Sequence, residues 1–440
     1  MNKHKSRRRL SLAFASLAVS ATMLVGCSAA SGGGVESTAG PADSKIGGTL
    51  TFLAQGDAAT AKNDPLAAEF EKKYPDVDVK IEYSATKTWD AFFSDLQTRL
   101  AAGKNYDLIY LPTEGERLLA SKGLVQPLDS WIARDKSEMD AFYADANPTI
   151  VEDAKEKSST DGSTYYIPYL FNTMGMYVNK STFENAGVPL PTAGWTWDDF
   201  RATCEALQKA SVQYCFDASS GYFDGISPWL ATNGADVMNA DWDQATADTP
   251  QAIEAATFTR GLVADGLTPV PGGSYDQNAL FAQGKIAMIG GGAWPTTSLL
   301  AANLKLSDFE IVPWPTQTQQ GSPVGWGAQA MLKSSNNKEA AWAYIKFLTS
   351  PEAQDLIGAN RLNDAIPVLQ SSIDKAKATN PEGYSYLFDA LDYATPVPGP
   401  AAALAVQQTV QEKYLSILTG NSSPEQGMKD MNSAISDEIK

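Results

Sequence analysis

The sequence predicts an α/β protein of more than one domain. Residues 77–83 alternate apolar with polar side chains, as a half-buried strand does, whereas residues 89–100 place their apolar side chains at helical spacing. Such strand and helix patterns alternate along the chain, which favours α/β architecture. About 395 residues follow the N-terminal segment described below, and a single hydrophobic core does not grow to that size.

The first elements can be placed in order. We expect a strand over residues 48–53, a helix opened by Asp64 and Pro65, the strand 77–83, the helix 89–100 ended by Gly103, and a strand 107–111 stopped by Pro112. Later helices begin with a capping residue and Pro, at positions 249–250, 350–351 and 423–424, while residues 196–199 form a capping-box variant. No period of 20 to 50 residues recurs, so a solenoid is not expected.

The N-terminus has the pattern of an export signal. Five basic residues and no acid lie within residues 1–9, and an apolar run follows over residues 10–25. The sequence Leu24-Val25-Gly26-Cys27 resembles a lipobox, which predicts a signal peptide over residues 1–26 and a lipid on Cys27. Residues 27–45, rich in Gly, Ser and Ala, are expected to form a flexible tether. The alternative is an ordinary secretory signal with a chance cysteine.

Charge and histidine content exclude several functions. The chain has 34 basic and 51 acidic residues, and removal of the five basic ones in the signal leaves 29 against 51, a net charge of −22. An acidic surface argues against nucleic acid as a partner. The one histidine, His4, leaves with the signal, which excludes Ser-His-Asp triads, Cys-His pairs and His-ligated zinc or copper sites. No metal or cofactor is expected.

Two cysteines remain once Cys27 is assigned to lipid. Cys204 and Cys215 lie at the end of an expected helix and in the strand after it, and an even pair in an oxidising compartment predicts a disulfide. Two buried free thiols are the alternative.

Four stretches resemble the solute-binding proteins of bacterial ABC importers, in the extracellular family 1 group whose best-known members bind maltose. The resemblance covers residues 46–440. The stretches are residues 49–57 with 69–75; residues 166–168, 176–180, 186–189 and 196–200; residues 281–288 with 292–294; and residues 340–348 with 350–352.

The resemblance implies a two-lobed periplasmic-binding-protein-like fold of type II, with three interlobe crossovers and the ligand in the cleft. It places the N-lobe at residues 46–168 and 315–364, and the C-lobe at residues 169–314 and 365–440. It further implies a monomer outside the cytoplasm that captures a carbohydrate by hinge closure and delivers it to the ABC permease in the membrane.

A sugar site requires aromatic faces and polar groups that bind hydroxyls. Trp294, after the glycines 290–292, matches an aromatic residue that stacks on sugar in the family. Tyr222 matches another such aromatic, with Asp224 beside it for hydroxyls, and Trp326 stands between Gly325 and Gly327. The alternative for each aromatic is a packing role within its lobe.

Further candidates lie near the ends of strands, where ligands bind in open α/β sheets. Gln55 and Asp57 end the first strand, and Glu114, after the strand 107–111, matches a ligand-binding acid of maltose-binding relatives. Those relatives have an aromatic residue just before this acid, where this chain has Leu111, so the match does not extend to the substrate of those relatives. Asn172 and Arg361, near the first and third crossovers, are expected to bind hydroxyls. Trp89, Trp197 and Trp342 lie in helix patterns and are expected in the core.

Other functions find less support. A glycosidase needs two carboxylates about 5 to 10 Å apart, and no pattern pairs two here. Ser335-x-x-Lys338 lacks the partner motifs of penicillin-binding enzymes. The acidic stretch 239–243 fails as a calcium loop, because Gln244 replaces the required glycine. A lipid-anchored adhesin would need a repeat or a stalk, and neither is found.

Overall fold

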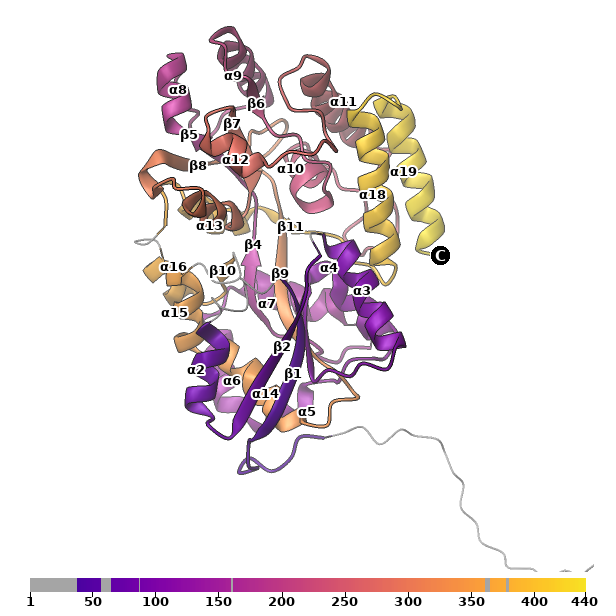
Figure 1. The fold of residues 1–440 in the computed structure, drawn as a ribbon. Coiled ribbons are helices and arrows are strands. Elements are labelled where there is room, and N and C mark those ends of the chain that lie inside the picture. Colours follow the sequence, from indigo (N-terminus) through magenta and orange to yellow (C-terminus); the bar gives the residue numbers. More distant parts are fainter. Residues whose placement is uncertain (1–37, 57–64, 87, 160, 361–364, 377–379) are drawn as a thin grey trace, which may run out of the picture. The chain divides into compact units, whose positions relative to one another are not determined.

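The computed structural model describes residues 38–56, 65–86, 88–159, 161–360, 365–376 and 380–440, and the description below is limited to them. Two sheets organise these residues (Figure 1). The elements packed on the larger sheet are called the first lobe, and those packed on the smaller sheet the second lobe.

The larger sheet has seven described strands in the order β10-β4-β9-β3-β1-β2, with β11 paired to β9. β2 and β3 run parallel to β1, whereas β9 pairs antiparallel with both β3 and β4. The strands are β1 (Gly48–Gln55), β2 (Val77–Ser84), β3 (Leu108–Pro112), β4 (Pro168–Asn172), β9 (Ser322–Met331), β10 (Ile366–Pro367) and β11 (Ala394–Pro396).

The smaller sheet has four described strands in the order β6-β7-β5-β8. β5 pairs antiparallel with β7 and β8, and β6 runs parallel to β7. The strands are β5 (Gly175–Asn179), β6 (Tyr214–Phe216), β7 (Ile286–Gly291) and β8 (Phe309–Pro313). The expected α/β class is confirmed.

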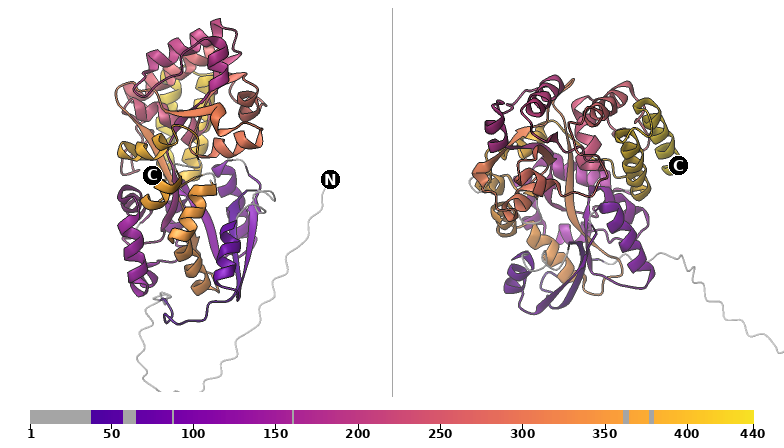
Figure 2. Two further views of the ribbon diagram at one scale, coloured as in Figure 1. Left: turned by 90° about the vertical axis from the view of Figure 1, so that its left-hand side faces the viewer. Right: turned by 45° about the horizontal axis from the view of Figure 1, so that its top comes forward.

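Helices cover both sheets (Figure 2). The helices of the first lobe are α2 (Pro65–Lys73), α3 (Trp89–Ala101), α4 (Thr113–Ser121), α5 (Asp129–Arg134), α6 (Lys136–Asp145), α7 (Pro148–Ser158), α14 (Lys338–Leu348), α15 (Pro351–Asn360) and α16 (Gln370–Ala376). The others are α8 (Lys180–Ala186), α9 (Trp197–Lys209), α10 (Ser227–Thr232), α11 (Pro250–Ala264), α12 (Gln277–Ala282), α13 (Trp294–Ala301), α17 (Ser385–Asp389), α18 (Ala403–Leu418) and α19 (Pro424–Glu438). Short turns are the π-helical η1 (Tyr222–Ile226) and the 3-10 turns η2 (Leu306–Asp308) and η5 (Ala390–Asp392).

The expected helix starts are confirmed where the structure describes them. The side chains of Thr249 and Ser423 accept backbone N–H groups of α11 and α19, and Ser350 does the same for α15. Thr196 and Asp199 form the expected reciprocal capping box at α9. Asp64, the expected cap of α2, lies outside the described residues.

Aromatic side chains dominate the core of the second lobe. Trp229 contacts the rings of Phe216 and Trp314 at centroid distances of 5.9 and 5.1 Å. Trp197, expected in the core, is 2% exposed and belongs to this cluster, and Trp342 is equally buried in the first lobe. Cys204 in α9 and Cys215 in β6 form the expected disulfide, which ties a helix to the strand after it.

The chain passes between the sheets after β4 and after β8, close to the expected first and second crossovers. The third differs from expectation. The expected C-lobe resumes at residue 365, but β10 pairs with β4 and α16 packs on α15, so residues 366–376 lie with the larger sheet. The chain joins the smaller sheet later, where Glu382 bridges to Glu310 of β8.

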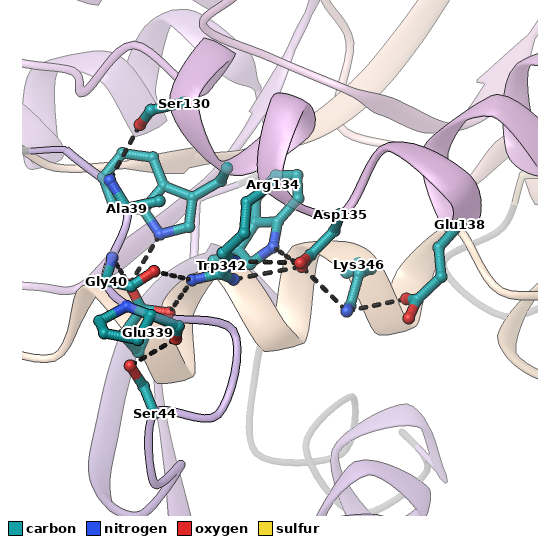
Figure 3. Close-up of polar contacts among 12 residues, drawn as sticks. Ala39, Gly40, Ser44, Ser130, Arg134, Asp135, Glu138, Glu339, Trp342 and Lys346 are labelled. Atoms are coloured by element: carbon teal, nitrogen blue, oxygen red, sulfur yellow. Dashed lines mark hydrogen bonds and ion pairs between the residues drawn. The ribbon is translucent and has the colours of Figure 1, made fainter.

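A polar network fixes the segment before β1 to the first lobe (Figure 3). The N–H of Gly40 donates to Glu339 Oε1 at 2.8 Å, and Arg134 Nη1 contacts both the carbonyl of Gly40 at 3.1 Å and Glu339 Oε2 at 2.6 Å. The indole of Trp131 donates to the same Glu339 oxygen at 3.0 Å, and Ala39 donates to Ser130. Residues 39 and 40 fall in the segment expected to be a flexible tether, yet here they are held.

We expect Glu339→Ala to lower the free energy of unfolding by about 1–3 kcal/mol, because Gly40, Trp131 and Arg134 all lose their acceptor. Urea unfolding measures the change. The control is Asp76→Asn, which removes the exposed Lys45–Asp76 pair and should cost less than about 0.5 kcal/mol. Equal, small effects of the two substitutions would contradict a structural role for Glu339.

Candidate functional site

A cavity of about 770 Å³ is lined by both lobes. The first lobe contributes the end of β1, the start of α3 and residues of β3, α4, β4, β9 and α14. The second contributes residues 219–221, η1, the start of α13 and two glutamines of α18. Seven of the residues predicted from sequence line it, namely Gln55, Glu114, Asn172, Tyr222, Asp224, Trp294 and Trp326. Asp57 and Arg361, also predicted, lie outside the described residues.

Trp294 is the first residue of α13, and the glycines before it make room for its ring. A Cβ atom on Gly292 would lie 2.4 Å from the indole of Trp294 and 2.6 Å from Asn172 Oδ1. The indole is partly buried and lies 6.1 Å, centroid to centroid, from the ring of Phe223. Two aromatic rings of the second lobe therefore form one wall of the cavity.

Asn172 lines the cavity, and its side chain also makes a bond between the two lobes. Its Oδ1 accepts the backbone N–H of Ala293 at 2.9 Å. Because Asn172 ends β4 and Ala293 precedes α13, this bond joins the two lobes and fixes the backbone that carries Trp294.

Trp326 and Tyr222 are almost fully buried in the cavity wall. Trp326 is 2% exposed, and its Nε1 donates to Glu116 Oε2 at 3.0 Å. Tyr222 is 3% exposed, with its hydroxyl 3.5 Å from the carbonyl of Pro398. The polar atoms of both rings have partners within the protein, so each offers the cavity mainly apolar ring surface.

The charged side chains among the described lining residues are Glu114 and Asp224, one from each lobe. Burial raises the pKa of Glu114 from 4.5 to about 7, although a hydrogen bond from its own backbone N–H lowers it. Burial also raises the pKa of Asp224, whose Oδ2 accepts the hydroxyl of Ser219 at 3.0 Å. Burial therefore favours the protonated form of both carboxyl groups, which can donate a hydrogen bond to a hydroxyl group as well as accept one.

Sequence reasoning missed other parts of the wall. Trp89, expected in the core, is only partly buried and lines the cavity from the first turn of α3, so that expectation is wrong. Gln329 is 4% exposed with no hydrogen-bond partner for Oε1, and buried Nε2 of Gln55 also lacks one. The other missed aromatic and glutamine residues are Phe52, Tyr83, Tyr110, Tyr169, Phe223, Tyr344, Gln407 and Gln411.

Within the described residues, no group of three or more His, Cys, Asp or Glu side chains could hold a metal ion. No helix of the described segments is long and apolar enough to cross a membrane.

The chain passes between two α/β lobes more than once, and both lobes line one cavity. This architecture is that of a two-lobed binding protein. The chain belongs to the family of bacterial extracellular solute-binding proteins, whose model matches residues 55–355. It is 28% identical over 304 residues to a binding protein of Brucella abortus, an alignment that covers 66% of this chain and 69% of the relative. It is 24% identical over 328 residues to the maltotriose-binding protein of Pyrococcus abyssi, covering 72% of this chain and 65% of that one.

The fold is also similar to a solved structure. The ABC substrate-binding protein of Listeria monocytogenes in complex with cycloalternan superposes with a TM-score of 0.78, at 25% identity, over 88% of this chain and 98% of that chain. The two-lobed fold that the sequence resemblance implied is confirmed.

We expect the free energy of unfolding of Glu114→Gln, relative to that of the wild type, to increase as the pH rises from 4.5 to 7. The folded wild type keeps its proton in this window while the unfolded chain loses it, so wild-type stability falls with rising pH, by at most about 3 kcal/mol for this group. Asp217 and Asp236, with pKa values raised to about 6 and 7, also lower the stability as the pH rises. Because both proteins contain them, their effect cancels in the difference between wild type and variant.

Urea unfolding of both proteins between pH 5 and 8 measures the difference. Asp95→Asn is the control, because hydrogen bonds from Ser84 and Arg99 lower the pKa of Asp95, which is ionised in both states above pH 5. A pH-independent difference between wild type and Glu114→Gln would contradict a buried Glu114 that titrates near pH 7.

Proposed function

We propose that this protein captures a carbohydrate, a di- or oligosaccharide, between its lobes for import by an ABC permease. The composition of the cavity wall carries the proposal. Ten lining residues are aromatic, and glutamine, asparagine and carboxyl groups lie among them, from both lobes. Sugar rings pack their C–H faces on aromatic rings and need polar partners for their hydroxyls. The ten are Phe52, Tyr83, Trp89, Tyr110, Tyr169, Tyr222, Phe223, Trp294, Trp326 and Tyr344.

Two comparisons support a saccharide in particular. The relative from Pyrococcus abyssi is a maltotriose-binding protein, and the Listeria structure contains cycloalternan. The cavity volume of about 770 Å³ lies within the range of small-molecule sites and leaves room for more than one sugar ring. The described part of the cavity wall has two acids and no lysine or arginine, which favours a neutral sugar over a sugar phosphate or uronate.

We propose that binding occurs without chemical change of the sugar, by lobe closure in a monomer. Glu114 and Asp224 are assigned to hydroxyl groups, with Gln55, Gln329, Asn172 and, outside the described residues, Asp57 and Arg361 as further polar residues of the site. An enzyme would instead release reducing sugar from oligosaccharides, which an assay of the purified protein detects.

We further propose that the protein lies outside the cytoplasm, anchored to the membrane by lipid on Cys27 and delivering its ligand to the permease. Cys27 lies outside the described residues, so this rests on the lipobox-like sequence. Two acyl chains would give stable anchoring where one would not.

We expect Trp294→Ala to weaken sugar binding about 10- to 100-fold, because loss of an aromatic stacking surface costs about 1–3 kcal/mol. A thermal-shift panel of sugars first identifies the ligand, since binding to the native state alone raises stability. Calorimetry then compares Trp294→Ala with Val270→Ala, a control at a side chain that is 70% exposed and outside the cavity wall. Unchanged affinity in a folded Trp294→Ala variant would remove Trp294 from the site.

We expect cells grown with labelled palmitate to incorporate label into the wild type and not into Cys27→Ala. Ser28→Ala, which keeps the cysteine and the residues before it, serves as the control and should be labelled. Equal labelling of wild type and Cys27→Ala would disprove the lipid anchor.

A further inference from the structure

Arg117 and Trp242 contact each other from different lobes. Arg117 lies on α4, which packs on β3, β9 and α7 of the first lobe. Trp242 lies between α10 and α11 and belongs to the hydrophobic core of the second lobe, where it is 4% exposed. The contact is therefore a side-chain link between the two lobes, which also meet where α10 contacts β9, where α18 contacts α3 and α4, and where Asn172 binds Ala293.

The geometry is that of a cation–π pair. The Cζ atom of the Arg117 guanidinium lies 5.3 Å from the centroid of the Trp242 ring, within the range of such contacts. Arg117 Nη1 also reaches the carbonyl oxygen of Asp241 at 3.4 Å. Because Arg117 is partly buried, the attraction is less weakened by water than at an open surface.

Each partner is fixed to its own lobe. Arg117 Nε donates to the carbonyl of Lys157 at the end of α7, at 2.9 Å. On the other side, Asn239 Oδ1 accepts the N–H groups of Asp243 and Gln244, both at 3.1 Å, which closes the loop around Trp242. Ala247, just after this loop, donates to Asn432 Oδ1 on α19 at 3.0 Å. Rotation of one lobe against the other therefore has to change the contact.

Trp242 has a backbone φ of +60°, in the left-handed region that bulky residues rarely adopt. A residue held in such a conformation by its surroundings points to a role beyond packing. The contact also adjoins the cavity. Arg117 lies one helical turn beyond Glu114, and Asp236, at the start of the same loop, is close enough to Tyr222 to raise its pKa.

We propose that Arg117 and Trp242 form an interlobe clasp that holds the lobes in the arrangement in which both line the cavity. Arg117 is thus a positioning residue, which touches no ligand and acts through the lobes. The effect of Arg117 on ligand affinity rests on the proposed function, whereas its effect on the distance between the lobes does not.

The test measures the distance between the lobes without any ligand. Spin labels are placed on cysteines introduced at exposed Ser137 of α6 and exposed Glu184 of α8, in protein carrying Cys27→Ser. Arg117→Met keeps the aliphatic stem and removes the guanidinium. Arg201→Met is the matched control, because Arg201 makes the same kind of contact, 5.8 Å from the ring of Phe258, within the second lobe.

We expect Arg117→Met to broaden the distance distribution and shift it to longer distances, and Arg201→Met to leave it unchanged. Trp242→Phe should produce a smaller shift, and adding it to Arg117→Met should produce little more, as a double-mutant cycle shows for residues that act through each other. An unchanged distribution in Arg117→Met, or additive shifts, would overturn the clasp.

The second measurement is the affinity for the sugar found in the thermal-shift panel. Arg117→Met should weaken it about 3- to 30-fold, the range expected for loss of one cation–π contact, with Arg201→Met unchanged. Unchanged or tighter binding would show that the contact does not stabilise the binding arrangement and would overturn the proposal. A wild type that binds no sugar would defeat the proposed function, while the distance measurement would still decide the clasp.

Discussion

The pairing of β9 with both β3 and β4 is the constraint on which the larger sheet and the cavity depend. Trp326 of this strand exchanges hydrogen bonds with Thr113 at the start of α4, and its indole donates to Glu116. A Cβ atom at Gly327 would lie 2.5 Å from the hydroxyl oxygen of Tyr110 and 2.7 Å from Leu170 Cδ1, so glycine leaves room for these two side chains. Displacing β9 would therefore move the cavity floor and, with α4, both Glu114 and Arg117.

The desolvation of the buried carboxyl groups costs free energy that hydrogen bonds within the protein offset only in part. Glu116 is 1% exposed, its Oε1 has no partner, and burial raises its pKa well above the ordinary value. Gln329 Oε1 is likewise buried without a donor. A ligand that supplies hydroxyl donors to Glu114 and Gln329, which line the cavity, would remove part of this cost, because buried polar groups are stable when hydrogen-bonded. The same feature that lowers stability would favour binding.

Local patterns predicted the helix caps, the strands and the Cys204–Cys215 disulfide, because each depends on residues close in sequence. The family resemblance, together with the position of Trp294 after a run of glycines, placed this residue at the cavity, which it lines. Local patterns failed for Trp89, because the apolar spacing of α3 is the same whether a residue faces the core or a cavity. The contact of Asn172 with Ala293 could not be predicted from local patterns, since it spans 121 residues. Strand β10, with two residues, has no pattern that could have assigned it to the larger sheet.

The N-terminal segment and the clasp act on opposite ends of the first lobe. Gly40 is bound through Glu339 of α14 and Arg134 of α5, near the start of β1, whereas the cavity adjoins Gln55 at the end of the same strand. A strand of eight residues separates these points by about 25 Å, at about 3.3 Å per residue. A force on the N-terminal segment therefore acts on the first lobe, at a distance from the segments that connect the two lobes after β4 and β8. The proposed Arg117–Trp242 clasp lies one helical turn from Glu114 at the cavity, and both of its residues lie outside the strands of the two sheets, so a force on the N-terminal segment would not act on it directly.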